Sequence, residues 1–226
     1  MGATIIPEPA LARLLAWFSP ANPIGAYSYS HGLEALCEAG ALADARAARD
    51  AIAVALTDGA GRTDAILTAH AWRAVHARDA AAFEHVRGLA VALSASRERR
   101  EETLHQGEAF VEVVAAAWPC DAPPPAPPLP LPVAVGALGA AHGVPLAALL
   151  FAATSAYVAN LVSAAVRLVP LGQTDGQRIT AALAPEVAEV AAGALGASLD
   201  DVGGAALGLD VAAMRHETQH VRLFRS

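Results

Sequence analysis

The sequence has little cysteine and no excess of basic residues. Its 226 residues include two cysteines, Cys37 and Cys120, and the formal net charge is −7. Two cysteines outside a C-x-x-C pair cannot build a disulfide framework or a redox pair, so we expect a reducing, cytosolic compartment. A nucleic-acid surface is excluded, because phosphate binding requires clustered lysine and arginine.

The chain also lacks a secretory signal pattern. No basic region precedes the apolar start, and Glu8 interrupts that stretch, so we expect a cytoplasmic protein. One uncharged run, Leu146 to Val166, is long enough to span a bilayer. Its high alanine content and its polar residues instead favour a central helix, packed on nearly all sides, in a soluble protein with no membrane partner. These polar residues are Thr154, Ser155, Asn160 and Ser163.

Patterns typical of β-strands are absent, and helical periodicity dominates. Alanine, leucine, arginine and glutamate fill most positions, and these residues cost least in a helix interior. The sequence therefore predicts an all-α fold, a single-domain bundle of about ten helices over residues 1–226. The segment Pro119 to Pro132 holds 8 of the 15 prolines, and it predicts a polyproline-like surface loop within that domain.

Helix boundaries follow from breakers and capping residues. We expect helices over residues 8–18, 28–39, 44–77 with a break at 58–62, 79–94, 97–117, 133–142, 145–169 and 209–221. Thr174 with Gln177, and Ser198 with Asp201, predict capping boxes.

Only one motif suggests catalysis. His216, Glu217 and His220 spell H-E-x-x-H, the zinc metalloprotease pattern, and a helix would place both imidazoles on one face. Catalytic zinc needs a third protein ligand, and only six residues follow His220. A terminal helix with two partly exposed histidines, capable at most of weak metal binding, is the favoured interpretation; a zinc metallohydrolase is the alternative.

Other motifs favour structural roles. Glu102 and His105 form a lone E-x-x-H, whereas a di-iron bundle needs two copies, so we interpret both as part of the polar face of a helix. The mixed-charge run Arg97 to Glu102 predicts a solvated helix face, and GQTDG lacks the lysine of a phosphate-binding loop. Without a catalytic constellation, the sequence favours a binding or scaffold protein.

Two segments suit a partner surface. Residues 221–226 place Leu223 and Phe224 between Arg222 and Arg225, an apolar and cationic plug that would fit the groove of a partner. Tyr27 and Tyr29 stand at a predicted helix entrance, where aromatic residues serve cores and interfaces alike.

Three blocks together resemble the urease accessory protein UreF family. They are Ser19 to Glu34, Ala159 to Arg178 and His216 to Ser226, with a looser match from Ser96 to Gly107. Their order and spacing fit the whole chain. This sequence departs from the family pattern in the expanded proline-rich loop, at Ala26, where a second glycine is usual, and at His220, where an aromatic residue is expected. The protease-like motif thus arises from one departure.

The resemblance implies a chaperone rather than an enzyme. Such a protein dimerises and bridges UreD, also called UreH, to the GTPase UreG, so that nickel reaches apo-urease. No cofactor is expected to be tightly bound: the complex handles Ni²⁺ and UreG binds GTP, whose hydrolysis the protein would modulate.

The resemblance also implies sites. The C-terminal residues Arg222, Leu223, Phe224 and Arg225 would dock into UreD, and Tyr29, His31 and Glu34 are candidates for UreG contact. Asn160 and Arg167 are polar residues of the predicted central helix, which we expect to be largely buried, so both should have specific partners. Intramolecular hydrogen bonds are the favoured interpretation, and a place at the dimer seam or a water-lined passage is the alternative.

Overall fold

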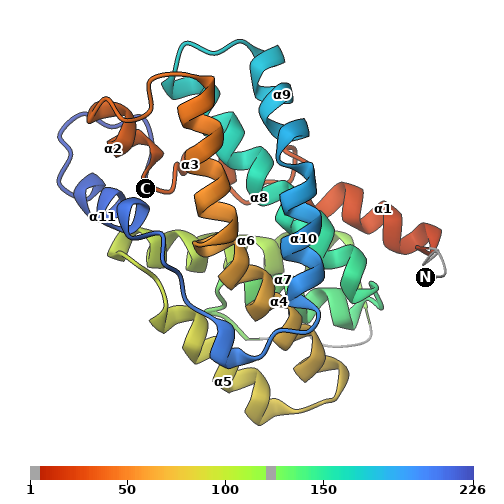
Figure 1. The fold of residues 1–226 in the computed structure, drawn as a ribbon. Coiled ribbons are helices and arrows are strands. Elements are labelled where there is room, and N and C mark those ends of the chain that lie inside the picture. The colour runs from red at the N-terminus through yellow and green to blue at the C-terminus, as the bar shows by residue number, and fades with distance from the viewer. Residues whose placement is uncertain (1–5, 121–125) are drawn as a thin grey trace.

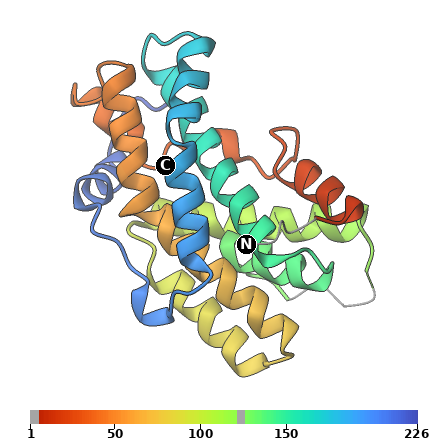
Figure 2. The same ribbon diagram turned by 45° about the vertical axis from the view of Figure 1, so that its right-hand side comes forward.

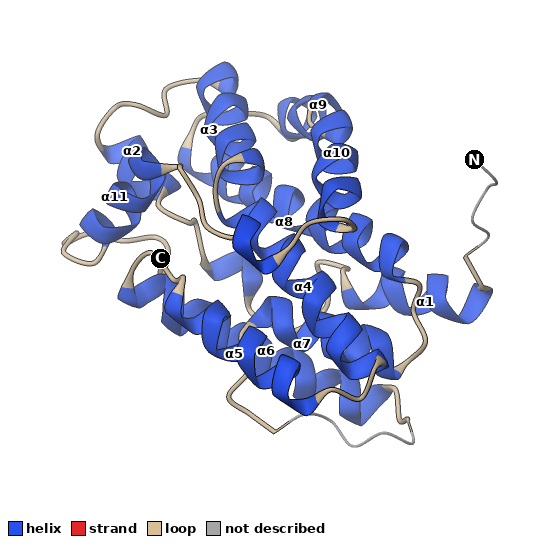
Figure 3. Ribbon diagram, turned by 60° about the horizontal axis from the view of Figure 1, so that its bottom comes forward, coloured by secondary structure: helices blue, strands red, loops and turns tan. Residues whose placement is uncertain are grey.

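The computed structural model describes residues 6–120 and 126–226, and within these ranges it contains helices and loops but no β-strand. Figure 1 shows the arrangement, and Figure 3 shows that helices joined by loops make up the described chain. The elements are α1 (Glu8–Trp17), η1 (Ala26–Ser28), α2 (Leu33–Glu38), α3 (Ala45–Thr57), α4 (Ala60–His76), α5 (Ala80–Ala92), α6 (Arg97–Ala117), α7 (Leu131–Ala141), α8 (Leu146–Leu168), α9 (Gln173–Ala182), α10 (Ala184–Ala194), η2 (Leu199–Asp201) and α11 (Leu207–His216). The all-α prediction is confirmed.

Two large apolar cores and a smaller one hold the helices together. The first joins α1 to α4–α7 and includes Trp17 and Phe110, whose rings meet edge to face at 5.7 Å between centroids. The second lies among α2, α3, α8 and α9 and includes Ile52 and Leu161. The third, around Leu150, joins α4, α8 and α10, which lie side by side in Figures 1 and 2. α4 and α8 therefore connect the cores.

Side-chain caps fix several helix starts. Asp44, Asp79 and Ser96 each accept a hydrogen bond from the backbone N–H three residues further on, at the first turns of α3, α5 and α6. These caps satisfy donors that the helix itself leaves free. The predicted range 97–117 agrees with α6, and the predicted break between α3 and α4 is also confirmed.

Three local predictions are wrong. α2 begins only at Leu33, because His31 and Gly32 have left-handed backbone conformations, with φ of 56° and 85°. α11 ends at His216 rather than near residue 221. At the start of α9 the backbone N–H of Gly172 donates to Asp175 at 3.4 Å, so the predicted capping box at Thr174 does not form.

The long apolar helix α8 packs against several helices and leaves one stripe exposed. By length and composition it is the one helix of the described chain that could cross a membrane, and 44% of its most apolar window is buried. Leu150 and Leu161 are buried, whereas Phe151, Ser163 and Arg167 are exposed. Most positions of α8 are thus buried or half-buried, as expected for a central helix, and the exposed residues form a single stripe along it.

The proline-rich segment is only partly a loop. Residues 121–125 lie outside the described residues. Leu129 is fully buried in the first core, and α7 starts at Leu131 with Pro132 in its first turn. Proline suits this position because its missing N–H would have no helical partner there. The end of the predicted loop is thus an anchor for α7.

Close contacts around α7 depend on two glycines. A Cβ atom added to Gly136 would lie 2.4 Å from the carbonyl oxygen of Thr68 in α4, and one added to Gly107 in α6 would lie 1.9 Å from that of Leu129. Both distances are far below van der Waals contact with backbone atoms, which cannot rotate away. Gly136 therefore allows α7 to approach α4, and Gly107 allows α6 to approach the segment just before α7.

We predict that Gly107→Ala lowers the free energy of unfolding by about 2–3 kcal/mol, because the methyl group forces α6 away from the segment before α7. Urea unfolding monitored by circular dichroism measures this. Gly88→Ala in α5 is the matched control: nothing lies within 4 Å of its added Cβ, so we expect a gain of about 0.5–1 kcal/mol. Equal effects of the two substitutions would contradict the packing argument.

Candidate functional site

The C-terminal segment, residues 217–226, is docked on its own chain. It lies beside α2 and α11, where the C-terminus is marked in Figure 1. The backbone N–H of Arg225 donates to the Ser28 carbonyl at 2.8 Å, and the N–H of Ser30 donates to the Ser226 carbonyl at 2.7 Å. The ring of Phe224 is 3% exposed and belongs to the second core. The prediction of a free plug is therefore wrong for Phe224.

Glu34 holds this segment through its backbone. One carboxylate oxygen accepts the N–H of Leu223 at 2.6 Å and the other accepts that of Phe224 at 2.9 Å. Glu34 is only 7% exposed, and hydrogen bonds to a buried carboxylate are among the stronger ones in proteins. This residue of α2 thus fixes the position of the C-terminal segment.

His216 joins Glu34 to a second buried carboxylate. Its Nε2 lies 2.9 Å from Glu34 and its Nδ1 lies 2.7 Å from Glu98, and the imidazole is completely buried. A carboxylate accepts and cannot donate, so the arrangement needs a proton at each contact. We call Glu34, His216 and Glu98 the acidic clamp; it ties α2, α6 and α11 together.

Residues on either side of the clamp extend it. Arg222 places Nη1 2.5 Å from the carboxylate oxygen of Glu98 that His216 does not contact, and thereby supplies a positively charged partner. Glu217 accepts the backbone N–H of Arg97 at 2.7 Å, so it caps the start of α6 from another part of the chain. An anion at a helix N-terminus is stabilised by the exposed N–H groups and the helix dipole.

A second charged cluster lies one turn along α6. Glu102 contacts Arg99, accepts from Gln106 and from the hydroxyl of Ser226 at 2.6 Å, and lies 2.9 Å from Nε2 of His31. Burial alone would raise the pKa of Glu102, but the Arg99 guanidinium and His31 outweigh it and lower this pKa to about 2. Burial and the charge of Arg99 lower the pKa of His31.

The sequence-based description of α6 is therefore wrong in one respect. The run from Arg97 to Glu102 was expected to be a solvated face, yet Glu98 and Glu102 are 6% and 2% exposed. His105 does lie on the exposed side, as expected. Glu98 and Glu102 are spaced i, i+4, which places both on one helix stripe, and that spacing is the only local signal of their burial.

The H-E-x-x-H pattern has no metal-site geometry. Both ring nitrogens of His216 already contact carboxylates, and Glu217 caps α6. His220 lies beyond the end of α11 and is exposed. Across residues 6–120 and 126–226, no group of three or more His, Cys, Asp or Glu side chains could share a metal ion. The motif serves the fold of the C-terminus.

The residues expected to face UreG are interior. Tyr29 is 5% exposed, and Glu34 and His31 belong to the two charged clusters. Their packing against the C-terminal segment and α6 leaves little surface for a partner.

The two residues of the central helix have intramolecular contacts. The side-chain amide of Asn160 donates to the Ala26 carbonyl at 2.9 Å, as favoured. Arg167 donates to the Ser163 carbonyl at 3.1 Å, and its guanidinium lies 4.3 Å from the centre of the Phe224 ring. Both residues therefore have the intramolecular partners that were favoured, although the side chain of Arg167 is exposed.

Comparison with known proteins settles the relationship. The UreF family model matches residues 42–184. Urease accessory protein UreF of Rhodopseudomonas palustris strain BisA53 is 52% identical over 96% of this chain and 93% of its own length. The chain belongs to the UreF family. UreF proteins of a Bradyrhizobium species and of Cereibacter sphaeroides are 51% and 52% identical, again over 96% of this chain, and over 92% and 99% of their own lengths.

UreF membership makes this chain a urease accessory protein, of a chaperone family and not a catalytic one. The zinc metallohydrolase alternative is thereby rejected. A match over 96% of this chain extends well beyond residues 42–184, the range of the family model.

We predict that Glu34→Gln destabilises the fold by about 2–4 kcal/mol. The NH2 group of glutamine donates hydrogen bonds, so only its carbonyl oxygen can accept from the two backbone N–H groups and from His216. Limited proteolysis should then cut first within residues 217–226, and urea unfolding should give the free-energy loss. Glu38→Gln, at the exposed last residue of the same helix, should match the parent protein. Retained protease resistance in Glu34→Gln would argue against the clamp.

Glu102 predicts a pH dependence with a defined sign. Its folded pKa of about 2 lies below its ordinary value of 4.5, so ionised Glu102 stabilises the fold above that ordinary value and less as the pH falls toward 2. Glu102→Gln should therefore cost about 2–3 kcal/mol at neutral pH, and this difference should shrink in acid. Urea unfolding across pH tests this, with the exposed Glu108→Gln as control; a pH-independent difference would contradict it.

Proposed function

We propose that this protein is the adaptor of urease maturation that bridges UreD (UreH) and the GTPase UreG, so that nickel is delivered into apo-urease. It binds no cofactor tightly in this role: Ni²⁺ is cargo of the complex, and GTP belongs to UreG, whose hydrolysis the adaptor modulates. Family membership and the absence of a phosphate-binding loop in the sequence support a protein that acts through surfaces.

One observation carries the proposed UreD contact. Beside the docked C-terminal segment, large apolar side chains face solvent on α11 and on the segment itself. We call these residues the C-terminal apolar surface: Leu207, Val211, Met214, Val221 and Leu223, which are 71%, 44%, 51%, 84% and 63% exposed. Leu207, Val211 and Met214 are spaced i, i+4, i+7 and so lie on one face of α11.

The residues that we propose for contact with UreD differ from those expected from the sequence of the C-terminal segment. Leu223 and Arg225 face outward and are candidates for contact with UreD, whereas Phe224 stays in the core and Arg222 serves the clamp. Large apolar side chains exposed together in this way are typical of a protein interface. Docking of the segment thus presents the surface in one fixed shape, which lowers the entropy cost of binding.

The contacts with UreG and with a second copy of the chain are also part of the proposal. Tyr27, 68% exposed, is the aromatic residue of the N-terminal block that a partner can reach, and it replaces Tyr29 as the candidate there. A homodimer is expected by family relationship, with an exposed stripe of α8 that includes Phe151 as one possible seam.

We predict that Leu223→Asp lowers the affinity for UreD by about tenfold or more, because a charge is placed in an apolar contact of about 1–2 kcal/mol or greater. Capture of purified UreD on immobilised protein, followed by biolayer interferometry, measures the change. Helicity and the unfolding midpoint should not change, since the side chain is exposed in the free protein.

Leu195→Asp is the matched control, because Leu195 is 39% exposed at the end of α10 and away from the C-terminal segment. Phe224→Ala is unsuitable, since it removes a core ring. If Leu223→Asp binds UreD as tightly as the Leu195 variant does, the assignment of the C-terminal apolar surface to UreD is wrong.

A further inference from the structure

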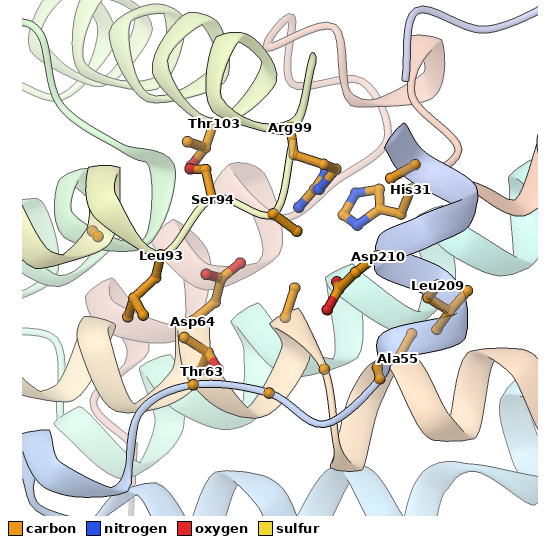
Figure 4. A pocket seen from close by; sticks show the side chains of 18 of the residues that line it. His31, Ala55, Thr63, Asp64, Leu93, Ser94, Arg99, Thr103, Leu209 and Asp210 are labelled. Atoms are coloured by element: carbon orange, nitrogen blue, oxygen red, sulfur yellow. The ribbon is translucent and has the colours of Figure 1, made fainter. Parts of the chain in front are cut away.

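A cavity of about 410 Å³ lies between α4, the turn from α5 to α6, and α11. Its volume falls in the range of about 300–1,000 Å³ that is usual for ligand sites. Alanine and glycine form much of its wall, and the exposed residues Leu93 and Gly204 stand at its rim. Figure 4 shows the polar side chains that reach into it, among them Asp64 from α4 and Asp210 from α11.

The two carboxylates in the cavity lack partners. Within the described residues, neither Asp64 nor Asp210 has a hydrogen bond or an ion pair. Burial raises the pKa of Asp64 to about 7, and it also raises the pKa of Asp210; the Arg99 guanidinium opposes both shifts. Arg99 is already paired with Glu102, so it does not neutralise the two aspartates. Two partly desolvated carboxyl groups therefore face one cavity without a hydrogen-bonded or ion-paired partner among the described residues.

Two further polar groups in the cavity wall have no hydrogen-bond partner among the described residues. Thr63 is 8% exposed, and its hydroxyl has no hydrogen bond within the described part of the chain. Nδ1 of His31 is buried and likewise has no partner among residues 6–120 and 126–226. Buried polar atoms normally find partners, so Nδ1 of His31 points to a guest that supplies a hydrogen bond.

The chemistry of the wall favours a guanidinium over a metal ion. No set of three metal-binding side chains exists in the described residues, so an ion would be poorly held. A guanidinium carries five N–H donors in a plane, which can serve separate acceptors such as Asp64, Asp210 and Thr63. The alanine and glycine wall suits the methylene stem of an arginine, which packs on apolar surface.

We propose that this cavity is a socket for an arginine side chain of a partner protein, with Asp64 and Asp210 as its acceptors. The identity of that partner as UreD or UreG rests on the proposed function, whereas the recognition of a guanidinium does not. Binding would supply the missing positive charge and satisfy the free hydroxyl of Thr63.

The test uses butylguanidinium chloride as a probe for the arginine side chain and butylurea as its neutral isostere. Isothermal titration with the full chain at about pH 8, where Asp64 is ionised, should give millimolar binding of the guanidinium and about tenfold weaker binding of the urea. Below about pH 6 the protonation of Asp64 should weaken guanidinium binding. Equal binding of the two compounds overturns the proposal.

Variants locate the site. Asp64→Asn and Asp210→Asn should each weaken guanidinium binding by about tenfold, and the exposed Asp200→Asn should leave it unchanged. Circular dichroism checks the fold, and each Asn substitution is expected to fold because it removes an unpaired charge. Wild-type affinity in both cavity variants would place the probe elsewhere and overturn the socket.

A last experiment identifies which partner protein provides the arginine. The double variant Asp64→Asn, Asp210→Asn should lose about tenfold or more in affinity for UreD or for UreG. Undiminished affinity for both overturns the assignment to a partner even if the probe binds. If neither protein binds the parent chain while the probe does, the proposed function fails and the guanidinium site stands.

Discussion

The structure depends on one buried interaction, the imidazole of His216 between the carboxylates of Glu34 and Glu98. Burying two carboxylates is costly unless each is paired and hydrogen-bonded, and here every oxygen of both has a partner. The partners come from α2, α6, α11 and the C-terminal segment, which are distant in sequence. Loss of any one leaves an uncompensated buried charge, so these four parts must be in place together.

The same stripe of α6 couples the C-terminal segment to the cavity. Glu98 belongs to the clamp, Glu102 receives the hydroxyl of Ser226, and Arg99 pairs with Glu102 while it reaches the cavity wall. An undocked segment would remove one hydrogen bond from Glu102 and so weaken the restraint on Arg99. The proposed UreD surface and the proposed arginine socket are thus linked by one helix, which is a physical basis for sensing one partner through another.

The sequence predicts the local features of this fold and misses the long-range ones. α6 was predicted at its observed bounds because Ser96 is a local cap and the helical period is continuous. The burial of Glu98 and Glu102 was not predicted, because apart from Arg99 the side chains that surround them, His216, Arg222 and His31, are more than fifty residues away along the chain. The predicted end of α11 was too far along the chain for the same reason. Glu217 caps the distant helix α6 instead of continuing α11, and the helix propensity of the local sequence gives no sign of that contact.

The C-terminal motif is explained by the geometry of an extended chain. Successive side chains of such a segment point to opposite sides, and here Phe224 and Ser226 are buried while Leu223 and Arg225 are exposed. The buried set joins the core and Glu102, and the exposed set remains beside the apolar face of α11. Arginine, leucine and phenylalanine therefore do not form a single plug. The alternation divides the short sequence into an inner face that holds the fold and an outer face. The part of the proposed UreD surface that this segment contributes therefore has a fixed position only when the inner face is docked.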